Sequence, residues 1–372
     1  MADAILVVNA GSSSLKVALF SATGGDQPLA VAVAERLGTS EASFGLKGME
    51  AHPLLADASD ESAEPHSVAL DHLLSLLDEH FSDEIVVAGH RVVHGGARFL
   101  SPVRIDDMVV AELEALVPLA RTHQPYALSA IRSLATRGLT QIACFDTAFH
   151  ATIPERATTY ALPKRIRDNG VRRYGFHGLS YAWIARSLSS LGLQDVRVIA
   201  AHLGNGASLC GLVAGESRAT TMGFTPLDGL VMGERPGLTD PGAILFMAEE
   251  MGLPVSDIRQ ILFSESGLKG LSGGINDMRH LLASETAEAK LAVDVYCHRI
   301  IREAGAITAE IGGADAMIFT GGVGENAEAI RERVLDGLSF LGPLSVHTIA
   351  ANEEAMIAEV ARAFLTSLDY SQ

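Results

Sequence analysis

The sequence predicts an α/β protein built from two related domains, on three observations. Apolar runs typical of buried strands alternate with stretches of helical spacing along most of the chain. The 372 residues exceed what one hydrophobic core usually holds. Residues 198–215 repeat the design of residues 5–20, in which two apolar runs flank a tip of glycine and small polar residues. We therefore expect two related halves whose hairpin tips face one cleft, a common place for a ligand.

Helix and strand signals follow one another in order along the chain. Helical spacing marks the stretches 71–80, 106–120, 179–193, 240–253, 291–313 and 325–338. Apolar runs that end at glycine or at a polar residue mark strands within 84–96, 141–150, 196–215 and 316–320. No Pro/Ser linker separates these elements, so composition alone marks no domain boundary.

Composition and charge exclude several classes of protein. A net charge of -17 repels nucleic acid and anionic membrane surfaces. The basic cluster at 165–173 has no stacking aromatic residues spread along it, which favours a solvated or ion-paired face. Neither a signal peptide nor a long apolar run is evident, so we expect a cytoplasmic protein. Cys144, Cys210 and Cys297 form no CxxC pair and are expected to be buried apolar residues.

Both hairpin tips carry groups that suit an anion. Asn9, Gly11 and three serines separate the apolar runs of the first hairpin, and Lys16 follows. The second tip, at 202–208, combines glycines with an amide and an imidazole. Most Ser/Gly turns are solvated loops. Backbone N–H groups, hydroxyls and a nearby lysine can also hold phosphate, so each tip is either a plain turn or a phosphate site.

A third glycine turn joins a predicted strand to a predicted helix. Gly321, Gly322 and Gly324 follow the apolar run 316–320, and such a turn favours phosphate or a nucleotide. The stretch GGVGENA matches G-x-G-x-x-A, but too little chain follows for a Rossmann domain, which disfavours NAD. No Walker or protein kinase signature occurs.

Four residues near strand ends and glycine turns are candidates for chemistry. Arg91 can hold a carboxylate in bidentate fashion or form an interdomain salt bridge. Asp146 closes its strand and can cap a turn, orient an arginine or approach a metal ion. His177 lies in an aromatic, glycine-rich turn and Arg235 in a long loop, a class that is often functional. Both are alternatively plain turn residues.

Several separate stretches together resemble one family, the acetate kinases, within the superfamily of acetate and sugar kinases, heat-shock chaperone ATPases and actin. The stretches are NAGSSSLK, GHRVVHGG, FDTAFH, RRYGFHG, HLGNGAS, GFTPLDGLVMGERPG, DMR, GGVGEN and NEE, and they span nearly the whole chain. The resemblance implies two actin-like ATPase (ribonuclease H-like) domains, at 1–147 and 148–355, with an active-site cleft between them. The last helix, 356–372, is expected to pack back on the first domain.

The resemblance also implies an activity and its cofactors. The ATP γ-phosphoryl group would pass reversibly and in line to acetate, giving acetyl phosphate and ADP. Mg²⁺ would assist, with Mn²⁺ as an alternative ion. A homodimer is implied as well.

Site roles follow from the resemblance position by position. Arg91 resembles the residue that holds the substrate carboxylate, Asp146 the essential acid, and His177 with Arg235 the pair that stabilises the transferring group. His123 matches a further active-site imidazole. The acyl pocket is carried onto Val93, Thr122, Phe176 and Pro226, and metal association onto Asn9 and Glu353. Phosphate or nucleotide contacts are implied for Ser12, Ser14, Lys16, His202, Leu203, Gly204, Asn205, Gly206, Asp277, Met278, Arg279, Gly321, Gly322, Val323, Gly324, Glu325 and Asn326.

The sequence departs from the family pattern at two places. THQP, at 122–125, stands where the family more often has LHNP, and MGERPG, at 232–237, stands where MGTRSG is common. Thr122 is shorter than leucine, so we expect the acyl pocket to gain roughly the room of one methylene.

The physics of the implied reaction agrees with these assignments. A carboxylate that attacks ATP brings two anions together, and unit charges about 4 Å apart repel by roughly 4 kcal/mol at an effective dielectric of 20. Cations such as Arg91 and Arg235 would offset this repulsion. A short carboxylic acid is already ionised at neutral pH, so Asp146 is expected to orient groups rather than remove a proton.

Two alternatives stay open at this point. One is a related kinase for propionate or butyrate. The other, from a different class, is a nucleotide-switch protein of the same superfamily that binds ATP and a protein partner. Such a switch has no evident need for both Arg91 and Arg235.

Overall fold

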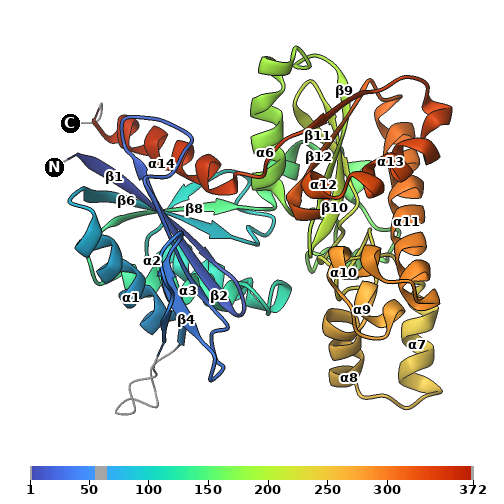
Figure 1. Ribbon diagram of the computed structural model, residues 1–372, viewed down its shortest axis with the longest axis horizontal. Coiled ribbons are helices and arrows are strands. Elements are labelled where there is room, and N and C mark those ends of the chain that lie inside the picture. The colour runs from blue at the N-terminus through green and yellow to red at the C-terminus, as the bar shows by residue number, and fades with distance from the viewer. Residues whose placement is uncertain (1, 55–64, 370–372) are drawn as a thin grey trace. The chain divides into compact units, whose positions relative to one another are not determined.

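The computed structural model describes residues 2–54 and 65–369, which form two compact units (Figure 1). The N-terminal unit contains the described residues up to Ala148 together with those from Asn352 on, and the C-terminal unit contains Phe149–Ala351. Met1 of the expected domain 1–147 and residues 370–372 of the expected last helix lie outside the described residues. Each unit is a mixed α/β structure on its own sheet. In the described part of the chain, no helix has the length and apolar character needed to span a membrane.

The N-terminal unit contains an eight-stranded sheet in the order β5-β4-β3-β2-β1-β6-β8-β7. From β5 to β1 neighbouring strands are antiparallel, β1, β6 and β8 are parallel, and β7 pairs antiparallel with β8. The strands are β1 (Asp3–Ala10), β2 (Ser14–Ser21), β3 (Ala30–Glu35), β4 (Ser43–Leu46), β5 (His52–Pro53), β6 (Glu84–Val92), β7 (Val103–Arg104) and β8 (Thr140–Phe145).

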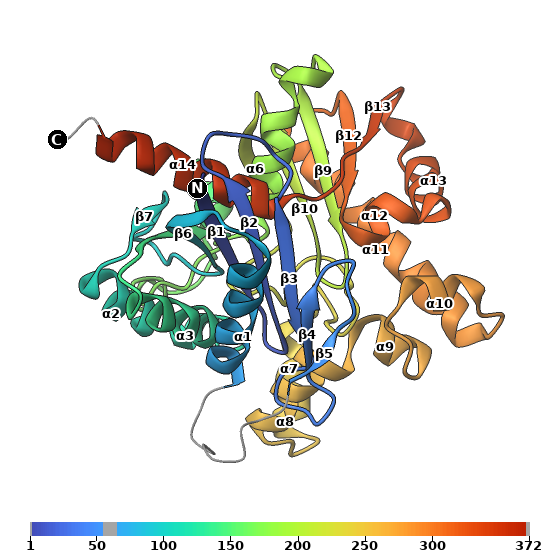
Figure 2. The ribbon, with the colours of Figure 1, turned by 60° about the vertical axis from the view of Figure 1, so that its left-hand side comes forward.

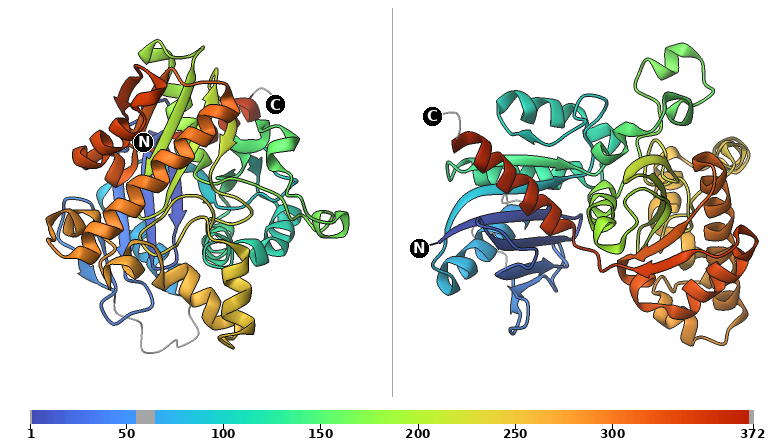
Figure 3. Two further views of the ribbon diagram at one scale, coloured as in Figure 1. Left: turned by 90° about the vertical axis from the view of Figure 1, so that its right-hand side faces the viewer. Right: turned by 90° about the horizontal axis from the view of Figure 1, so that it is seen from above.

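Side-chain alternation in β1 and β6 divides this unit into two faces. Leu6 belongs to the core formed with α1 (Pro65–His80) and α3 (Gln124–Ala135), and α2 (Asp107–Ala115) packs on α3. Gly89 is on the opposite face, under α14 (Glu353–Asp369), where a Cβ would lie 2.5 Å from Ile357 Cγ2. Figure 3 shows α14 lying along the strands. Asn9 and Arg91 share the α14 face by the same alternation.

The C-terminal unit contains a five-stranded sheet in the order β11-β10-β9-β12-β13. Its strands are β9 (Arg197–Leu203), β10 (Ala207–Val213), β11 (Glu216–Thr220), β12 (Ala316–Thr320) and β13 (Ser345–Thr348). Figure 2 shows β9, β12 and β13 side by side. The first three strands are antiparallel neighbours and the last three are parallel, which is the arrangement of β3-β2-β1-β6-β8. The prediction of two related halves is confirmed at the level of strand order and direction.

Two helices cover the faces of this second sheet. α6 (Gly178–Ser187) packs Tyr181 and Ile184 onto one face. α11 (Ala287–Ile311) covers the other so closely that a Cβ at Gly211 would lie 2.7 Å from Ile307 Cγ2. The remaining helices are α4 (Glu155–Thr158), α5 (Lys164–Arg167), α7 (Pro241–Glu249), α8 (Val255–Gln260), α9 (Gly267–Ser272), α10 (Met278–Ala283), α12 (Gly321–Asn326) and α13 (Glu328–Gly337).

Two further features of the chain bear on the site. Residues 221–240, between β11 and α7, contain no helix or strand and are called the 221–240 loop below. The cysteines Cys144, Cys210 and Cys297 are buried and free, as predicted.

Candidate active site

Arg91 and Asp146 form an ion pair at the ends of adjacent parallel strands. Arg91 Nη2 donates to Asp146 Oδ2 at 2.7 Å, and Nε donates to the same oxygen at 3.1 Å. The Asp146 side chain is 2% exposed, whereas that of Arg91 is 22% exposed. Burial by itself would lower the pKa of Arg91, but Asp146 and Glu353 outweigh it and raise the pKa. The structure therefore holds a permanent positive charge at a partly open position.

The first residues of α14 complete this cluster. Arg91 Nη1 lies 3.4 Å from Asn9 Oδ1 and 3.4 Å from Glu353 Oε2. Lys16 is opposite Asn9 in the β1–β2 pair, and its Nζ lies 2.8 Å from Glu354 Oε1. Burial raises the pKa of Glu354, but Lys16 outweighs this effect and the pKa is lowered. Glu354 thus stays ionised at neutral pH, and Lys16 is held by it beside the hairpin tip.

The oxygens of this cluster fit a divalent metal ion. Mg²⁺ prefers hard oxygen ligands and is usually held by one or two carboxylates plus substrate phosphates. Asn9 Oδ1 and Glu353 Oε2, which contact the same Arg91 nitrogen, are ligands of this kind. Across residues 2–54 and 65–369 no group of three or more His, Cys, Asp or Glu could hold a metal by itself. Asn9 Oδ1 and Glu353 Oε2 would therefore supply only part of the coordination of such an ion.

The tip of the first hairpin is held from α1. Gly11 N donates to Ser14 O at 2.8 Å, which closes the turn, and Ser12 is exposed at its outside. His66 Nε2 lies 2.8 Å from the carbonyl oxygen of Gly11, and the His66 ring stacks on Tyr126 with centroids 4.4 Å apart. His66 therefore holds the hairpin tip in place, and no role for this residue was predicted from the sequence.

Gln124 connects two of the stretches predicted to form the acyl pocket. Its side chain is fully buried; Oε1 accepts from His94 N at 3.3 Å, and Nε2 donates to His94 O at 3.2 Å. His94 follows Val93, which is buried, and Gln124 follows His123. Thr122 is exposed, and its Oγ1 lies 2.9 Å from His123 Nδ1. Gln124, the glutamine of THQP, thus connects the turn after β6 to the start of α3.

In the C-terminal unit, His177 and Arg235 meet at the second hairpin tip. A Cβ at Gly206 would lie 3.2 Å from His177 Nε2 and 2.8 Å from Arg235 Nη2. His177 has a left-handed backbone, with φ 59°, immediately before α6. Its Nδ1 lies 2.9 Å from Ser208 Oγ, which in turn is 2.5 Å from Tyr181 Oη. Strained non-glycine conformations of this kind concentrate at functional sites.

Arg235 is held by its own loop. Its Nη1 donates to the carbonyl oxygen of Pro226 at 2.8 Å. Burial lowers the pKa of Arg235 to about 10, with Glu234 acting in the opposite direction, so the guanidinium is charged at neutral pH. Glu234 Oε1 also accepts from Lys269 Nζ at 2.9 Å. The glutamate of MGERPG therefore makes an ion pair with Lys269 of α9.

Phe176 is 2% exposed and is held by a residue that the sequence did not single out. His150 Nε2 donates to the carbonyl oxygen of Phe176 at 2.9 Å, and His150 Nδ1 lies 2.8 Å from Ser217 Oγ. Burial lowers the pKa of His150 to about 4, so the ring is neutral at pH 7. Because Nε2 then carries the proton, Nδ1 accepts from the serine hydroxyl.

A cavity of about 740 Å³ in the C-terminal unit brings together three segments that were predicted to contact nucleotide. Its volume lies within the usual range for small-molecule sites. From the predicted set, its lining contains Gly204, Asn205, Asp277, Met278, Arg279, Gly322, Val323 and Asn326. The other lining residues are Leu268, Asn276, Leu282 and Ala327.

Hydrogen bonds and burial hold the segments that line this cavity. Glu325 Oε1 accepts from Gly321 N at 2.9 Å and from Ala351 N at 2.9 Å, so this carboxylate closes the turn after β12. Leu203 is buried, and His202 Nδ1 lies 2.8 Å from Ser180 Oγ. Asp277 accepts a hydrogen bond from the side chain of Arg279, which lowers the pKa of the Asp277 carboxyl.

Comparisons with known proteins show the family to which the chain belongs. The model of the acetokinase family matches residues 4–363. The acetate kinase of Rhodopseudomonas palustris (strain TIE-1) is 45% identical over 356 residues, which cover 92% of this chain and 88% of that protein.

Solved structures are similar over almost the whole chain. A propionate kinase from Francisella tularensis subsp. tularensis SCHU S4 has a TM-score of 0.90 at 34% identity, covering 97% of this chain and 99% of that one. The Porphyromonas gingivalis acetate kinase has a TM-score of 0.88 at 35% identity, covering 98% of this chain and 100% of that one. The chain therefore belongs to the acetokinase family, the phosphotransferases that have a carboxyl group as acceptor.

Proposed function

We propose that this protein transfers the γ-phosphoryl group of ATP reversibly to acetate, giving acetyl phosphate and ADP. The observation that carries the proposal is the family match over residues 4–363 together with the Arg91–Asp146 pair, which holds a fixed cation at a partly exposed position. In the forward direction a carboxylate oxygen of acetate attacks the γ-phosphorus. The bond from that phosphorus to the β,γ-bridging oxygen breaks, and ADP leaves with the bonding electrons.

Arg91 takes the role of binding the acetate carboxylate. Asp146 occupies Nε and Nη2 from one side, and Nη1 remains on the side of Asn9 and Glu353. Because acetate is ionised at neutral pH, the attack releases no proton and needs no general base. Asp146, which is fully engaged with Arg91, therefore acts as an orienting group.

His177 and Arg235 take the role of stabilising the transferring group. Phosphoryl transfer proceeds through a loose transition state in which positioning and electrostatic stabilisation supply most of the catalysis. The Arg235 guanidinium and the Nε2 atom of His177 border the same point beside Gly206, which supports a joint role on the phosphoryl oxygens. Ser208 holds the opposite ring nitrogen of His177 and so fixes the direction of Nε2.

ATP occupies the 740 Å³ cavity in this proposal, and Mg²⁺ is the preferred ion, with Mn²⁺ as an alternative. Asn9 and Glu353 would hold the ion, directly or through water. When bound, the ion neutralises charge on the phosphates. The proposal gives Ser12, Ser14 and Lys16 of the first hairpin tip a role in binding the phosphates, and the Lys16–Glu354 pair keeps the lysine beside that tip.

A second copy of the chain is the proposed partner. No residue of α7 is buried, although its sequence is PGAILFMAE. Leu245 and Phe246 are 56% and 57% exposed, and Met251 and Val255 continue the apolar surface towards α8. Exposed apolar surface of this kind marks protein interaction sites. We infer a homodimer that covers α7.

Propionate is the second candidate acceptor. Two observations favour it: one similar solved structure is of a propionate kinase, and Thr122 stands where the family more often has leucine. The same chemistry applies, with one further methylene to accommodate.

The test is hydroxylamine trapping of acyl phosphate with ATP and Mg²⁺ across a panel of C1 to C4 carboxylates. The expected result is rapid hydroxamate formation with acetate, and ADP release in equal amount. ATP binding without hydroxamate from any member of the panel would contradict the proposal and favour the nucleotide-switch alternative.

A further inference from the structure

The 221–240 loop is unusual because it is long and irregular yet largely buried. Long segments without secondary structure are uncommon inside compact domains. Met222, Leu230 and Met232 are fully buried in this loop. Buried backbone carbonyl and N–H groups must find partners. The loop contains no strand or helix, so these partners come from turns within the loop and from other parts of the chain.

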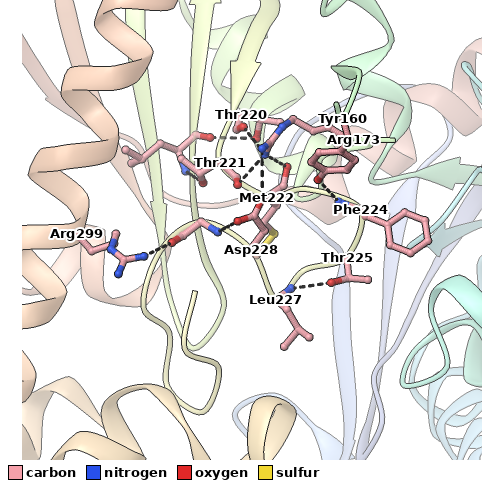
Figure 4. Close-up of polar contacts among 12 residues, drawn as sticks. Tyr160, Arg173, Thr220, Thr221, Met222, Phe224, Thr225, Leu227, Asp228 and Arg299 are labelled. Atoms are coloured by element: carbon pink, nitrogen blue, oxygen red, sulfur yellow. Dashed lines mark hydrogen bonds and ion pairs between the residues drawn. The ribbon is translucent and has the colours of Figure 1, made fainter. Parts of the chain in front are cut away.

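Arg173 supplies several of these partners at the start of the loop (Figure 4). Its Nη1 donates to the carbonyl oxygens of Thr220, Thr221 and Met222, at 3.1, 2.9 and 2.9 Å. Its Nη2 donates to Asp228 Oδ2 at 3.2 Å. The Arg173 guanidinium thereby connects the start of the loop to Asp228, in the middle of the loop.

Tyr160 and the backbone around Arg173 reinforce this attachment. The hydroxyl of Tyr160 accepts from Phe224 N at 2.9 Å, and the Arg173 guanidinium carbon lies 5.9 Å from the centre of the Tyr160 ring. Tyr174 N donates to the carbonyl oxygen of Gly223 at 3.0 Å. A Cβ at Gly223 would lie 2.3 Å from Tyr160 Oη, so the loop is pressed directly against these side chains.

The attachment reaches Arg235 through two short steps. Arg173 holds Asp228, and Arg235 Nη1 is bonded to the carbonyl oxygen of Pro226, close to Asp228 in the chain. Arg299 of α11 donates to the carbonyl oxygens of Gly229, in the middle of the loop, and of Leu238, near its end. Arg235 therefore lies between two segments of the loop that other arginines hold, Asp228 by Arg173 and Leu238 by Arg299.

We propose that Arg173 is a positioning residue for Arg235, acting through the carbonyls of residues 220–222 and through Asp228. The inference rests on the role proposed above for Arg235 in phosphoryl transfer. Arg173 lies in the same short segment as His177, so one stretch of chain carries one member of the phosphoryl pair and orients the loop that carries the other. Lysine could pair with Asp228 but could not reach three carbonyls and a carboxylate together, because only arginine has a planar fork of donors.

The test compares Arg173→Lys with a matched variant, Arg197→Gln. Arg197 also makes a bidentate ion pair, with Asp315, and also donates to a backbone carbonyl, at Gly312, but it lies outside the loop. We expect Arg173→Lys to lower kcat by about tenfold to a hundredfold, the usual effect of small misplacements of catalytic groups. The dissociation constant for ADP should stay within about threefold, since the cavity residues are not on this loop. Arg197→Gln should keep wild-type kcat even if its melting temperature falls.

A double variant separates positioning from a general loss of stability. If Arg173 acts through Arg235, then Arg173→Lys should change kcat by less than about threefold in an Arg235→Ala background. Independent, multiplicative losses would overturn the proposal. So would a wild-type kcat in Arg173→Lys, since charge alone would then suffice.

Hydrogen exchange tests the structural half of the proposal without using activity. Peptides that cover 221–228 should exchange faster in Arg173→Lys and at the wild-type rate in Arg197→Gln. If these peptides exchange faster in Arg173→Lys but the wild-type protein forms no acyl phosphate, the proposed function is refuted and the contact between Arg173 and the loop is not. If exchange in Arg173→Lys is unchanged, the structural role of that contact is refuted. If Arg173→Lys is insoluble, Asp228→Asn removes the carboxylate that Arg173 Nη2 contacts. Wild-type exchange and kcat in that variant would also overturn the proposal.

Discussion

Asp146 Oδ2 accepts from two nitrogens of Arg91, Nη2 at 2.7 Å and Nε at 3.1 Å, while Nη1 of the same guanidinium faces Asn9 and Glu353. The Nε–Nη2 edge of the arginine is thus used for orientation, and under the proposed function the Nη1–Nη2 edge binds the substrate carboxylate. A bidentate interaction along that edge needs the guanidinium plane to be fixed. Asp146 provides this constraint from a buried position.

Removal of either partner should abolish most activity. We expect Arg91→Ala and Asp146→Asn each to lower kcat/KM for acetate by at least about a hundredfold, because a preorganised donor or its orientation is lost. Circular dichroism should show a folded protein. Arg98→Ala, which breaks an exposed ion pair with Glu112, is the control and should be near wild type. Near-normal activity in Arg91→Ala would mean that another residue binds the carboxylate.

Asn9 and Glu353 should influence the metal requirement. In Asn9→Ala and Glu353→Gln, the Mg²⁺ concentration for half-maximal activity should rise about tenfold or more, since an oxygen near the ion is removed. The measurement is a Mg²⁺ titration at saturating ATP and acetate. Asp71→Asn, at an exposed ion pair, is the matched control. An unchanged titration in both variants would remove these residues from the metal site.

Buried histidines should make the protein unstable in mild acid. Burial lowers the pKa of His90 from 6.5 to about 4, with Gln141 acting in the opposite direction, and burial also lowers the pKa of His94 to about 4. Between these pH values the unfolded chain binds protons that the folded chain does not, so the free energy of unfolding falls as pH falls from 6.5 towards 4. Each group contributes on the order of 2–3 kcal/mol to this fall.

Urea unfolding at pH 7 and pH 5 measures the effect. His90→Asn should reduce the difference in the free energy of unfolding between pH 7 and pH 5, because one titrating group is lost. The same substitution at the exposed His52 should leave it as in wild type. Equal differences in all three proteins would contradict the assignment to buried His90.

Thr122 should affect acyl-chain preference. If the shorter side chain leaves room for one methylene, burying that group is worth about 0.8 kcal/mol, or roughly fourfold. The propionate-to-acetate ratio of kcat/KM should therefore fall clearly in Thr122→Leu.

The hydroxyl of Thr122 needs its own control because its oxygen lies 2.9 Å from His123 Nδ1. Thr122→Val removes this contact at nearly constant volume and should keep the wild-type ratio. A ratio that stays level or rises in Thr122→Leu would show that this position does not limit chain length.

The apolar surface of α7 should control assembly. Phe246→Glu places a charge where a second copy is proposed to pack, and we expect it to shift the protein from dimer to monomer at micromolar concentration. Sedimentation velocity measures this. Phe340→Glu, at another strongly exposed phenylalanine outside α7, should remain dimeric. A wild-type protein that sediments as a monomer would refute the proposed homodimer.

Local sequence signals were sufficient to predict β1, β2, β6, β8, β9, β10 and β12, the hairpin tips and the residues at strand ends, but not β3, β4, β5, β7, β11 or β13. Alternation and glycine turns are short-range patterns, so Asn9, Arg91 and Asp146 could be identified from their immediate neighbours. The resemblance to the family added their roles, and the two departures in THQP and MGERPG now have contacts, through Gln124 and Glu234.

The supporting residues could not be found in this way. His150 reaches Phe176 and Ser217, Gln124 reaches His94, and Arg173 reaches the carbonyls of a distant loop. Each contact joins segments that are far apart in sequence, and each uses a residue type that is common on surfaces. For Arg173, the sequence indicated a solvated or ion-paired face, and it contained no sign that the partner would be the backbone of the 221–240 loop.

The shared strand order of the two sheets has a consequence for how such an enzyme arises. In both units the same sheet edge carries the functional groups: a hairpin tip after the first strand and a turn after the next parallel strand. The N-terminal copy carries Asn9 and Arg91 there, and the C-terminal copy carries Gly206 and Gly321. A duplicated ancestral module would leave this pattern, and under the proposed function one copy supplies charged side chains for a small acceptor and the other supplies backbone groups for a nucleotide.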